Sequence, residues 1–405
     1  MKKLLYLFAG CALLGLSSCS DSPETAKSDY SRPIELSARA RSVSDNATKM
    51  DLKIFQTIND RYDSTHNAIV APLNLTTFLG MFSNMIDDED FNAAICDYFD
   101  TDDKAAVNDL VSEYMKQLSQ LDSRTKVSFT NKIWYDNSYT LSSSVTDVVE
   151  QYYDANFEAA DFGNQENLKV QINRWVNNMT DGMIDNWNVD EIHRFLAAQV
   201  MLFNGTWTEE FDAAKTKEGV FHTPEGINDV VVPMMQGTLP GQYYATDDYL
   251  VLRFEFGSGE YVADFVLPRE DVEIHNVIAE PDFGQWTEAD MERKAYNVKM
   301  PKFSVNQEVK QLFGALKSID PRFDIAGKHI ALFEEDAENI SSILQHVAFD
   351  ISESGAKAVA VTYNGTVTAY RPDEAVFNRP FALMIRLRET GAVLIAARIA
   401  NPLQK

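Results

Sequence analysis

Residues that could carry out catalysis are scattered along this 405-residue chain rather than gathered in motifs. The six histidines, at positions 66, 193, 222, 275, 329 and 346, do not form the His-Glu-x-x-His pattern of a zinc-binding helix. The sequence also lacks a Gly-rich phosphate loop ending in Gly-Lys-Ser/Thr and a Gly-x-Ser-x-Gly nucleophile turn. A Ser-His-Asp set could still assemble in three dimensions, because such triads are defined by geometry. Without a local signature, the sequence argues against an enzyme and predicts no metal or cofactor.

The chain is strongly acidic, with a formal net charge of -25. Such a surface repels phosphate backbones, so nucleic acid is not an expected partner. Acidic residues cluster at 87–90 and 334–336, but neither cluster has the spacing of a calcium loop. We interpret both clusters as solvated faces rather than metal sites.

The N-terminus has the features of a targeting segment. Two lysines precede an apolar stretch at residues 4–16, which is too short to span a bilayer as a stop-transfer helix. The following Leu16-Ser17-Ser18-Cys19 resembles the lipobox of bacterial lipoproteins. The alternative is an ordinary signal peptide that happens to contain a cysteine.

The lipobox resemblance implies a signal peptide at residues 1–18, cleaved before Cys19, and lipid attached to the Cys19 thiol. Ser20 follows the cysteine, which favours the outer membrane or cell surface. Residues 19–47 have little periodicity and are expected to be a flexible tether to the membrane. One folded domain is then expected at residues 48–405, large for a single core.

Only one cysteine remains after these two assignments. Cys11 would leave with the signal peptide and Cys19 would carry lipid, so no intrachain disulfide can form in the mature chain. Cys96 lies in an apolar-periodic stretch, where a buried structural thiol is expected.

The elements that must position any site change in type along the chain. Helical periodicity dominates the first half and strand patterns dominate the second, which predicts an α+β fold rather than a wound α/β sheet. Helices are expected near residues 52–62, 75–85, 107–121, 145–157 and 168–179. Strands are expected at residues 126–135, 195–203, 230–235, 249–255, 261–267, 294–301, 358–363, 382–388 and 393–399.

The most informative stretch is residues 353–362, with the sequence Glu-Ser-Gly-Ala-Lys-Ala-Val-Ala-Val-Thr. In a strand, Ala356, Ala358 and Ala360 would share one face, which holds only small side chains. No proline occurs between Gly355 and Pro372, so the backbone donors of a strand are kept. This segment could therefore enter the middle of a β-sheet.

The residues after this stretch are not strand-like, because 364–372 are polar and end in proline. A plain β-hairpin is the alternative, with Asn364-Gly365 as a two-residue type I′ turn. The local pattern taken alone favours that hairpin.

Across residues 46–402 the sequence resembles the serpins, a family whose hinge reads Glu-x-Gly-x-x-Ala-x-Ala before a long exposed loop. The matching hinge residues here are Glu353, Gly355, Ala358 and Ala360. Trp207 falls in Phe-Asn-Gly-Thr-Trp, which resembles the strand-end motif of the family's breach tryptophan. Further matches are Ile172-Asn173-Arg174-Trp175-Val176 with Thr180, Gly182 and Ile184, Val232-Pro233-Met234-Met235, Leu267-Pro268, Met300-Pro301-Lys302-Phe303, Asn378-Arg379-Pro380-Phe381, and Asn401-Pro402. Their order along the chain outweighs the hairpin interpretation.

The resemblance implies a serpin fold, in which N-terminal helices pack on a large mixed central sheet, with further β-sheets and a reactive-centre loop at about residues 353–372. Counting from Gly355 as the fifteenth residue before the scissile bond places that bond at Ala369-Tyr370. The implied activity is suicide inhibition, in which a protease is acylated at Ala369 and the cleaved loop inserts into the main sheet.

The residue before the scissile bond suggests the target. Alanine at position 369 suits elastase-like serine proteases, which have shallow primary pockets. If the bond lies after Tyr370, chymotrypsin-like targets are expected instead, and subtilisin-like enzymes are a further class to test. We expect the inhibitor to act as a monomer.

Several residues depart from the family pattern where the sheet parts. The family's Ser-Pro-x-Ser is Ala-Pro-Leu-Asn at residues 71–74, and by alignment Gln199 replaces an Asn and Gln345 replaces a His. A hydrogen bond between the two glutamine amides could replace the family's link. The alternative is an alignment slipped by one residue, since His346 comes next.

Two further inferences rest on the resemblance. Glu353 and Lys302 match a family ion pair, which is a structural brace and not catalytic. The unusual residues in the parting region motivate a second hypothesis, that of a non-inhibitory serpin acting as a surface binding or structural protein.

Overall fold

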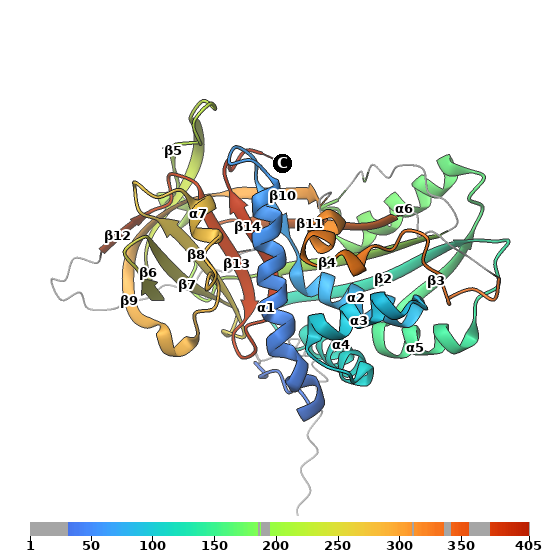
Figure 1. The fold of residues 1–405 in the computed structure, drawn as a ribbon. Helices are drawn as coiled ribbons and strands as arrows, with labels where there is room; N and C mark the ends of the chain where they lie inside the picture. Colours follow the sequence, from blue (N-terminus) through green and yellow to red (C-terminus); the bar gives the residue numbers. More distant parts are fainter. Residues whose placement is uncertain are drawn as a thin grey trace, which may run out of the picture.

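The computed structural model describes residues 31–184, 187, 195–309, 312–335, 342–355 and 373–404. Helices of the first half group beside a five-stranded sheet, and a nine-stranded sheet lies next to them (Figure 1). The α+β class expected from the sequence is therefore observed. The helices are α1 Ala38–Arg61, α2 Pro72–Met85, α3 Glu89–Phe99, α4 Lys104–Leu118, α5 Ser143–Tyr153, α6 Gln165–Met179, α7 Ile274–Ile278 and α8 Leu312–Ile319.

The strands divide between the two sheets. The five-stranded sheet has the order β10-β11-β4-β2-β3. The nine-stranded sheet has the order β1-β14-β13-β8-β7-β6-β9-β12, with β5 paired to β6. The strands are β1 Ala68–Val70, β2 Thr125–Asp136, β3 Ala155–Ala160, β4 Phe195–Gly205, β5 Lys217–Phe221, β6 Val230–Ala245, β7 Tyr249–Phe256, β8 Tyr261–Pro268, β9 Glu292–Pro301, β10 Phe303–Glu308, β11 Ser342–Ile351, β12 Asp373–Val376, β13 Phe381–Leu387 and β14 Val393–Ile399.

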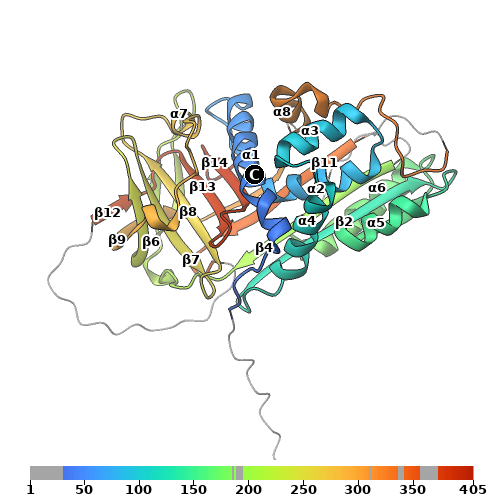
Figure 2. The ribbon, with the colours of Figure 1, turned by 60° about the horizontal axis from the view of Figure 1, so that its bottom comes forward.

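Strand β4 lies in the middle of the five-stranded sheet and is buried on both faces. Its side chains alternate between two cores, as the period of two in a strand requires. Phe195, Ala197 and Met201 join the large core, to which α1–α5 also contribute. Leu196, Ala198 and Val200 join a smaller core formed with α6. Figure 2 shows α1–α4, coloured from blue to cyan, grouped together beside the sheet.

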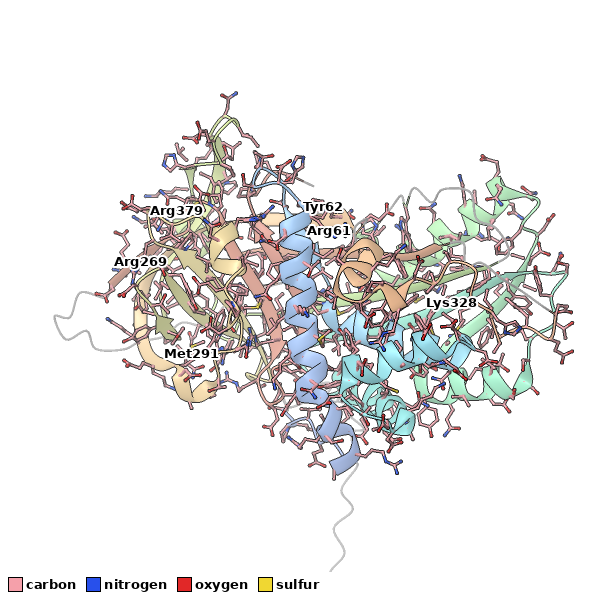
Figure 3. The ribbon with its side chains drawn as sticks, viewed as in Figure 1. Arg61, Tyr62, Arg269, Met291, Lys328 and Arg379 are labelled. Carbon is pink, nitrogen blue, oxygen red and sulfur yellow. The ribbon has the colours of Figure 1, made fainter. Side chains whose placement is uncertain are left out.

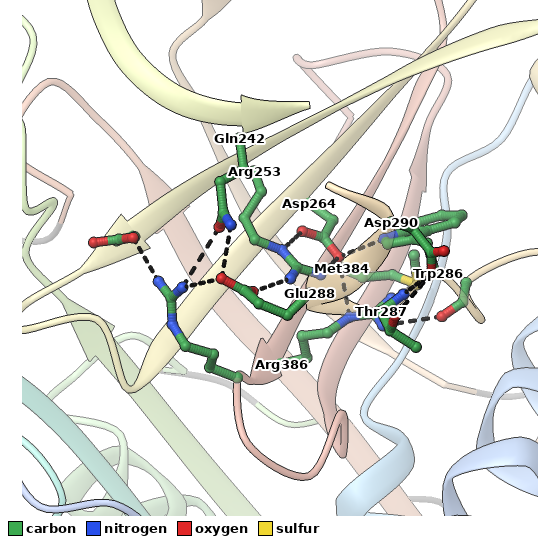
Figure 4. A network of polar contacts seen from close by, with 12 residues as sticks. Gln242, Arg253, Asp264, Trp286, Thr287, Glu288, Asp290, Met384 and Arg386 are labelled. Carbon is green, nitrogen blue, oxygen red and sulfur yellow. Dashed lines mark hydrogen bonds and ion pairs between the residues drawn. The ribbon is translucent and has the colours of Figure 1, made fainter. Parts of the chain in front are cut away.

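The nine-stranded sheet contains a buried ionic network (Figure 4). Asp264 on β8 accepts hydrogen bonds from Arg253 on β7, at 2.6 and 2.9 Å, and lies 3.1 Å from Arg386 on β13. Burial raises the pKa of Asp264, but the two guanidinium groups lower it by more. A single carboxylate therefore links three neighbouring strands and stays ionised.

The first helix begins earlier than the sequence suggests. Helix α1 starts at Ala38, where the Ser37 side chain accepts a hydrogen bond from the Ala40 backbone, so the expected boundary between tether and domain at residues 47 and 48 lies inside the helix. Ala40 and Val43 are buried, and this part of the helix packs on the core. The sequence does not predict this early start of α1, because alanine and serine make up most of the buried face of this part of the helix.

Two other details differ from the sequence-based expectations. The helix expected to reach residue 157 ends at Tyr153, and residues 155–160 form β3 instead. The acidic cluster at 87–90 is more than a solvated face, because Asp88 caps the N-terminus of α3 and pairs at 2.5 Å with Lys328, which Figure 3 labels. No helix in the described part of the chain is long and apolar enough to cross a membrane.

Candidate functional site

The hinge is a tight turn that lies across the end of β4. After β11 ends, Gly355 donates to the Ser352 carbonyl at 3.1 Å and forms a bridge with Thr206. Gly355 has a φ of +81°, and a Cβ there would lie 2.3 Å from the Gly205 carbonyl oxygen. Only glycine fits this conformation and this close approach.

Trp207 attaches the turn to the end of β4 by hydrogen bonds. Its backbone nitrogen donates to the Ser354 carbonyl at 3.1 Å, and its indole Nε1 donates to the Ser352 carbonyl at 2.9 Å. The ring is 2% exposed and stacks on Phe256, with centroids 4.1 Å apart. The hinge is thus attached to the end of β4 by two hydrogen bonds from one buried residue.

Glu353 anchors the same turn to the second sheet. Its carboxylate lies 3.0 Å from the Lys302 ammonium and accepts a hydrogen bond from Thr216 at 2.8 Å. Its backbone carbonyl accepts from the Phe211 nitrogen at 2.8 Å. Burial raises the pKa of Glu353, but the hydrogen bonds that its carboxylate accepts, that from Lys302 first, lower it by more, so the group is ionised at neutral pH.

Strands β4 and β11 are parallel neighbours that pair along only part of their length. Their register runs from Leu196 opposite Ser342 to Val200 opposite His346. Among the described residues, no pairing joins the later parts of the two strands, 201–205 and 347–351. A cavity of about 720 Å³ lies there, lined by Leu202 and Asn204 of β4 and by Asp350 and Ile351 of β11, and Gly355 lies at its edge.

The two glutamines lie opposite each other in this register but do not bond through their side chains. Gln345 accepts from the Ala71 nitrogen and donates to the Ala71 oxygen, both at 3.0 Å, which ties β11 to the start of α2. Gln199 donates to Asn131 on β2 at 2.7 Å. The expected Gln199–Gln345 hydrogen bond is therefore wrong for the described structure, because the Gln345 amide bonds Ala71 and the Gln199 amide bonds Asn131.

His346 lies on the opposite face from Gln345. Its Nε2 lies 2.5 Å from the Oδ1 of Asn306, and its ring packs against Trp187 in a T-shaped arrangement. Burial lowers the pKa of His346 to about 4. Gln345 faces α2, so no one-residue slip of the alignment is needed to place a polar group there.

The remaining candidate residues divide into two groups. Ala356, Ala358, Ala360, Ala369, Tyr370 and Cys19 lie outside the described residues. Cys96 is a free thiol on α3 that is partly exposed rather than fully buried. Within the described ranges, no group of three or more His, Cys, Asp or Glu could hold a metal ion.

Sequence reasoning missed three residues of this site. Ser352 and Thr216 bond the hinge, and Asn131 bonds Gln199. None belongs to a recognisable local pattern, since Thr216 and Asn131 act through segments distant in the sequence and Ser352 bonds through its backbone carbonyl. The alternation of β2, which turns Asn131 inward, was the one available signal.

Together, the two sheets, the glycine hinge and the parting strands define a protein of the serpin class. A family model described as serpin (serine protease inhibitor) matches residues 45–402. The chain belongs to the serpin family, whose members are in general protease inhibitors rather than enzymes.

Known proteins agree with this assignment. Plasminogen activator inhibitor 1 of Neovison vison is 26% identical over 381 residues, covering 88% of this chain and 92% of that protein. Alpha-1-antiproteinase of Callosciurus caniceps is 24% identical, and the match covers 99% of this chain and 98% of that protein. The thermophilic serpin tengpin in its native state superposes with a TM-score of 0.77 at 21% identity, over 92% of this chain and 97% of that one. Thyroxine-binding globulin complexed with thyroxine gives a TM-score of 0.78 at 18% identity, over 89% and 99% of the two chains. These structures share the serpin fold.

Proposed function

We propose that this serpin is a suicide inhibitor of elastase-like serine proteases, acylated at Ala369 and acting as a monomer. The observation that carries the proposal is the partial pairing of β4 with β11. A parallel neighbour pair that is already apart beside the hinge offers a place for one more strand.

The proposed reaction begins with attack of the protease serine on the Ala369 carbonyl and cleavage of the Ala369-Tyr370 bond. The freed segment 356–369 then enters between β4 and β11. Fourteen residues at strand rise span about 45 Å, enough to carry the attached protease far from its docking site. Ala356, Ala358 and Ala360 place no bulk or charge on the entering face.

A trapping assay tests the inhibitor directly. The protein is mixed with elastase, chymotrypsin and a subtilisin, and the products are separated in SDS. We expect a covalent complex with elastase, together with release of a C-terminal peptide that begins at Tyr370. Loop cleavage without a complex, for every protease tried, would sink the proposal.

A substitution at residue 369 tests the position of the scissile bond. Ala369→Arg places a long cation in the primary pocket of the protease, so it should redirect inhibition toward trypsin-like enzymes. An unchanged target profile would show that another bond is attacked, and the start of the released peptide then identifies it.

The proposed location is the outer membrane or cell surface of a bacterium, with lipid on Cys19 after removal of residues 1–18. The support is the lipobox-like sequence before that cysteine. Cys19→Ala should abolish lipid labelling and membrane association, and labelling that persists in this variant would count against the lipid anchor.

A second candidate is a non-inhibitory binding serpin. It is favoured by the similarity of the fold to thyroxine-binding globulin and by the replacement of family residues at Gln199 and Gln345. The trapping assay separates the two candidates, because a binding serpin is cleaved without trapping the protease.

A further inference from the structure

A pocket opens on the nine-stranded sheet where two neighbouring strands separate. Strand β6 pairs with β7 from Ala245 opposite Leu250 to Gln242 opposite Arg253. Among the described residues, no pairing joins the two strands beyond that last pair. A cavity of about 400 Å³ lies there, which is within the size range of small-molecule sites. Its walls come from β6, β7 and β9 and from the segment that follows β4.

The floor of this pocket consists of side chains that are already paired. Arg253 is 3% exposed, and its guanidinium bonds Asp264 and Glu288 (Figure 4). Gln242 is also buried and donates to Glu288 at 2.6 Å. A Cβ on Gly241 would lie 2.9 Å from the Arg253 carbonyl oxygen, so the strands are in close contact at the narrow end. The floor is therefore fixed before any ligand arrives.

Five charged side chains line the pocket, and three of them have partners of opposite charge. One of the three is the Arg253 of the floor. Glu255 lies 2.6 Å from Arg388, and Lys294 pairs with Asp373. These three charges are neutralised by the protein itself and do not call for a ligand.

The other two charged side chains are Glu209 and Arg293, which are exposed and opposite in sign. Within the described part of the chain, neither side chain forms a hydrogen bond or an ion pair, with each other or with any other residue. Each can therefore bond a group of the opposite charge placed between them. An arginine binds a carboxylate through two parallel hydrogen bonds, and a glutamate accepts hydrogen bonds from an ammonium.

The backbone holds both of these residues at the pocket. Arg293 lies on β9 directly opposite Gln242 of β6. Glu209 follows Thr208, whose hydroxyl donates to the Gly257 carbonyl at 2.7 Å. Two rigid parts of the sheet thus present an anion and a cation to one cavity.

We propose that this pocket binds a small zwitterion, an amino acid or a short peptide whose carboxylate meets Arg293 and whose ammonium meets Glu209. Pro240 and the ring of Phe254 belong to the same lining and offer an apolar wall to the side chain of the ligand. A ligand with one charge would leave the other protein charge without a partner, so both ends are needed for the full affinity. The proposal does not depend on the inhibitory function.

Titration calorimetry on the uncleaved protein tests the site with leucine and with alanyl-leucine, which distinguish a free amino acid from a peptide. We expect at least one of them to bind with a Kd of about 1 mM or tighter. The N-acetylated form lacks the ammonium and the C-amidated form lacks the carboxylate. Each should bind about tenfold more weakly, because one charge-assisted contact is lost. No binding of either ligand, or equal binding of the free and modified forms, would overturn the proposal.

Two variants assign the two ends of the ligand. Arg293→Gln should bind the free and the C-amidated ligand equally, because the partner of the carboxylate is gone. Glu209→Gln should bind the free and the N-acetylated ligand equally, for the corresponding reason. Both side chains are exposed and unpaired, so both variants should melt within about 2 °C of the wild type.

Glu292→Gln is the matched control on the same strand. Glu292 precedes Arg293, so the alternation of a strand turns it to the other face, where it accepts from Tyr243 at 2.6 Å. This variant should keep the affinity and its dependence on both charged ends. If Glu292→Gln weakens binding as much as Glu209→Gln does, or if Arg293→Gln still prefers the free ligand to the amide, the assigned contacts are refuted.

Discussion

Gly355 passes so close to Gly205 that a methyl group on its Cα would meet the Gly205 carbonyl oxygen at 2.3 Å. The contact joins the last residue of β4 to the first part of the hinge, which are distant in the sequence. The hinge can rest on β4 only because Gly355 carries no side chain there.

This contact predicts the effect of Gly355→Ala. The added methyl group collides with backbone and also occupies a positive φ, so the uncleaved protein should lose about 2–4 kcal/mol. Thermal unfolding measures the loss. Gly391→Ala is the control, because Gly391 has a φ of +70° with nothing within 4 Å of the added Cβ. If the two substitutions cost the same, the close contact with Gly205 contributes nothing.

The Glu353–Lys302 ion pair should contribute modestly. Lys302 is 47% exposed and Glu353 15% exposed, so water screens the pair, and a double-mutant cycle of Glu353→Gln with Lys302→Met should give a coupling of about 0.5–1 kcal/mol. Because the pKa of Glu353 is lowered, this stabilisation is present above the ordinary Glu pKa and is lost as the pH falls through the lowered value. A coupling that does not decrease on acidification would contradict this assignment.

Ionisation of Asp51 should make the protein less stable as the pH rises. It is completely buried on α1 and accepts hydrogen bonds from Tyr98 at 2.5 Å and Thr76 at 2.8 Å, and burial raises its pKa to about 7. The neutral carboxyl favours folding, so its contribution is complete below pH 3.8 and is lost as the pH rises through about 7.

The substitution Asp51→Asn keeps the shape and removes the charge. It should raise the free energy of unfolding more at pH 8 than at pH 5, and the two gains should differ by about 2 kcal/mol or more. Thermal unfolding at the two pH values measures both gains. Asp45→Asn, on the exposed side of the same helix, is the matched control. An Asp51→Asn protein that is equally affected at both pH values would mean that the carboxyl is ionised throughout.

The entering face of the loop should not tolerate charge. Ala356→Arg places a cation where the inserted strand is buried, so it should convert the inhibitor into a substrate. Val359→Arg, on the opposite face, should keep most of the trapping. The ratio of trapped to cleaved protein in SDS is measured for both variants. Equal trapping by the two variants would contradict the assignment of residues 356 and 359 to opposite faces of the strand.

The long strands were predicted well because their burial follows a simple pattern. Residues 261–267 are apolar almost throughout, as expected for a strand buried on both faces, and they form β8. Strands β10 and β11 were not predicted, since polar residues such as Gln345 and His346 interrupt the apolar pattern. Those residues are buried only because α2 and α6 cover the two faces of the sheet, which a local pattern cannot reveal.

The candidate site was predictable to a similar extent. The hinge residues Glu353 and Gly355 could be selected because they match the hinge pattern of the family, and the structure gives Glu353 an ion pair and Gly355 a positive φ. The partner of Gln345 could not, because a flexible amide can bond either a neighbouring amide or a backbone group. The backbone of Ala71 was the partner, through contact between segments that are far apart in the sequence.

The incomplete pairing of β4 with β11 has a kinetic consequence. We expect the sheet to open pair by pair from the end where the pairing of β4 with β11 stops. Each remaining pair is then unaffected until the pairs before it have separated. The last pair at this end is His346 with Val200, so it separates first and Gln345 with Gln199 follows. The rate of opening should therefore depend on these two pairs and on the hydrogen bonds of Gln345 to Ala71, while substitutions further along the paired strands change the total stability and leave the first step unaltered.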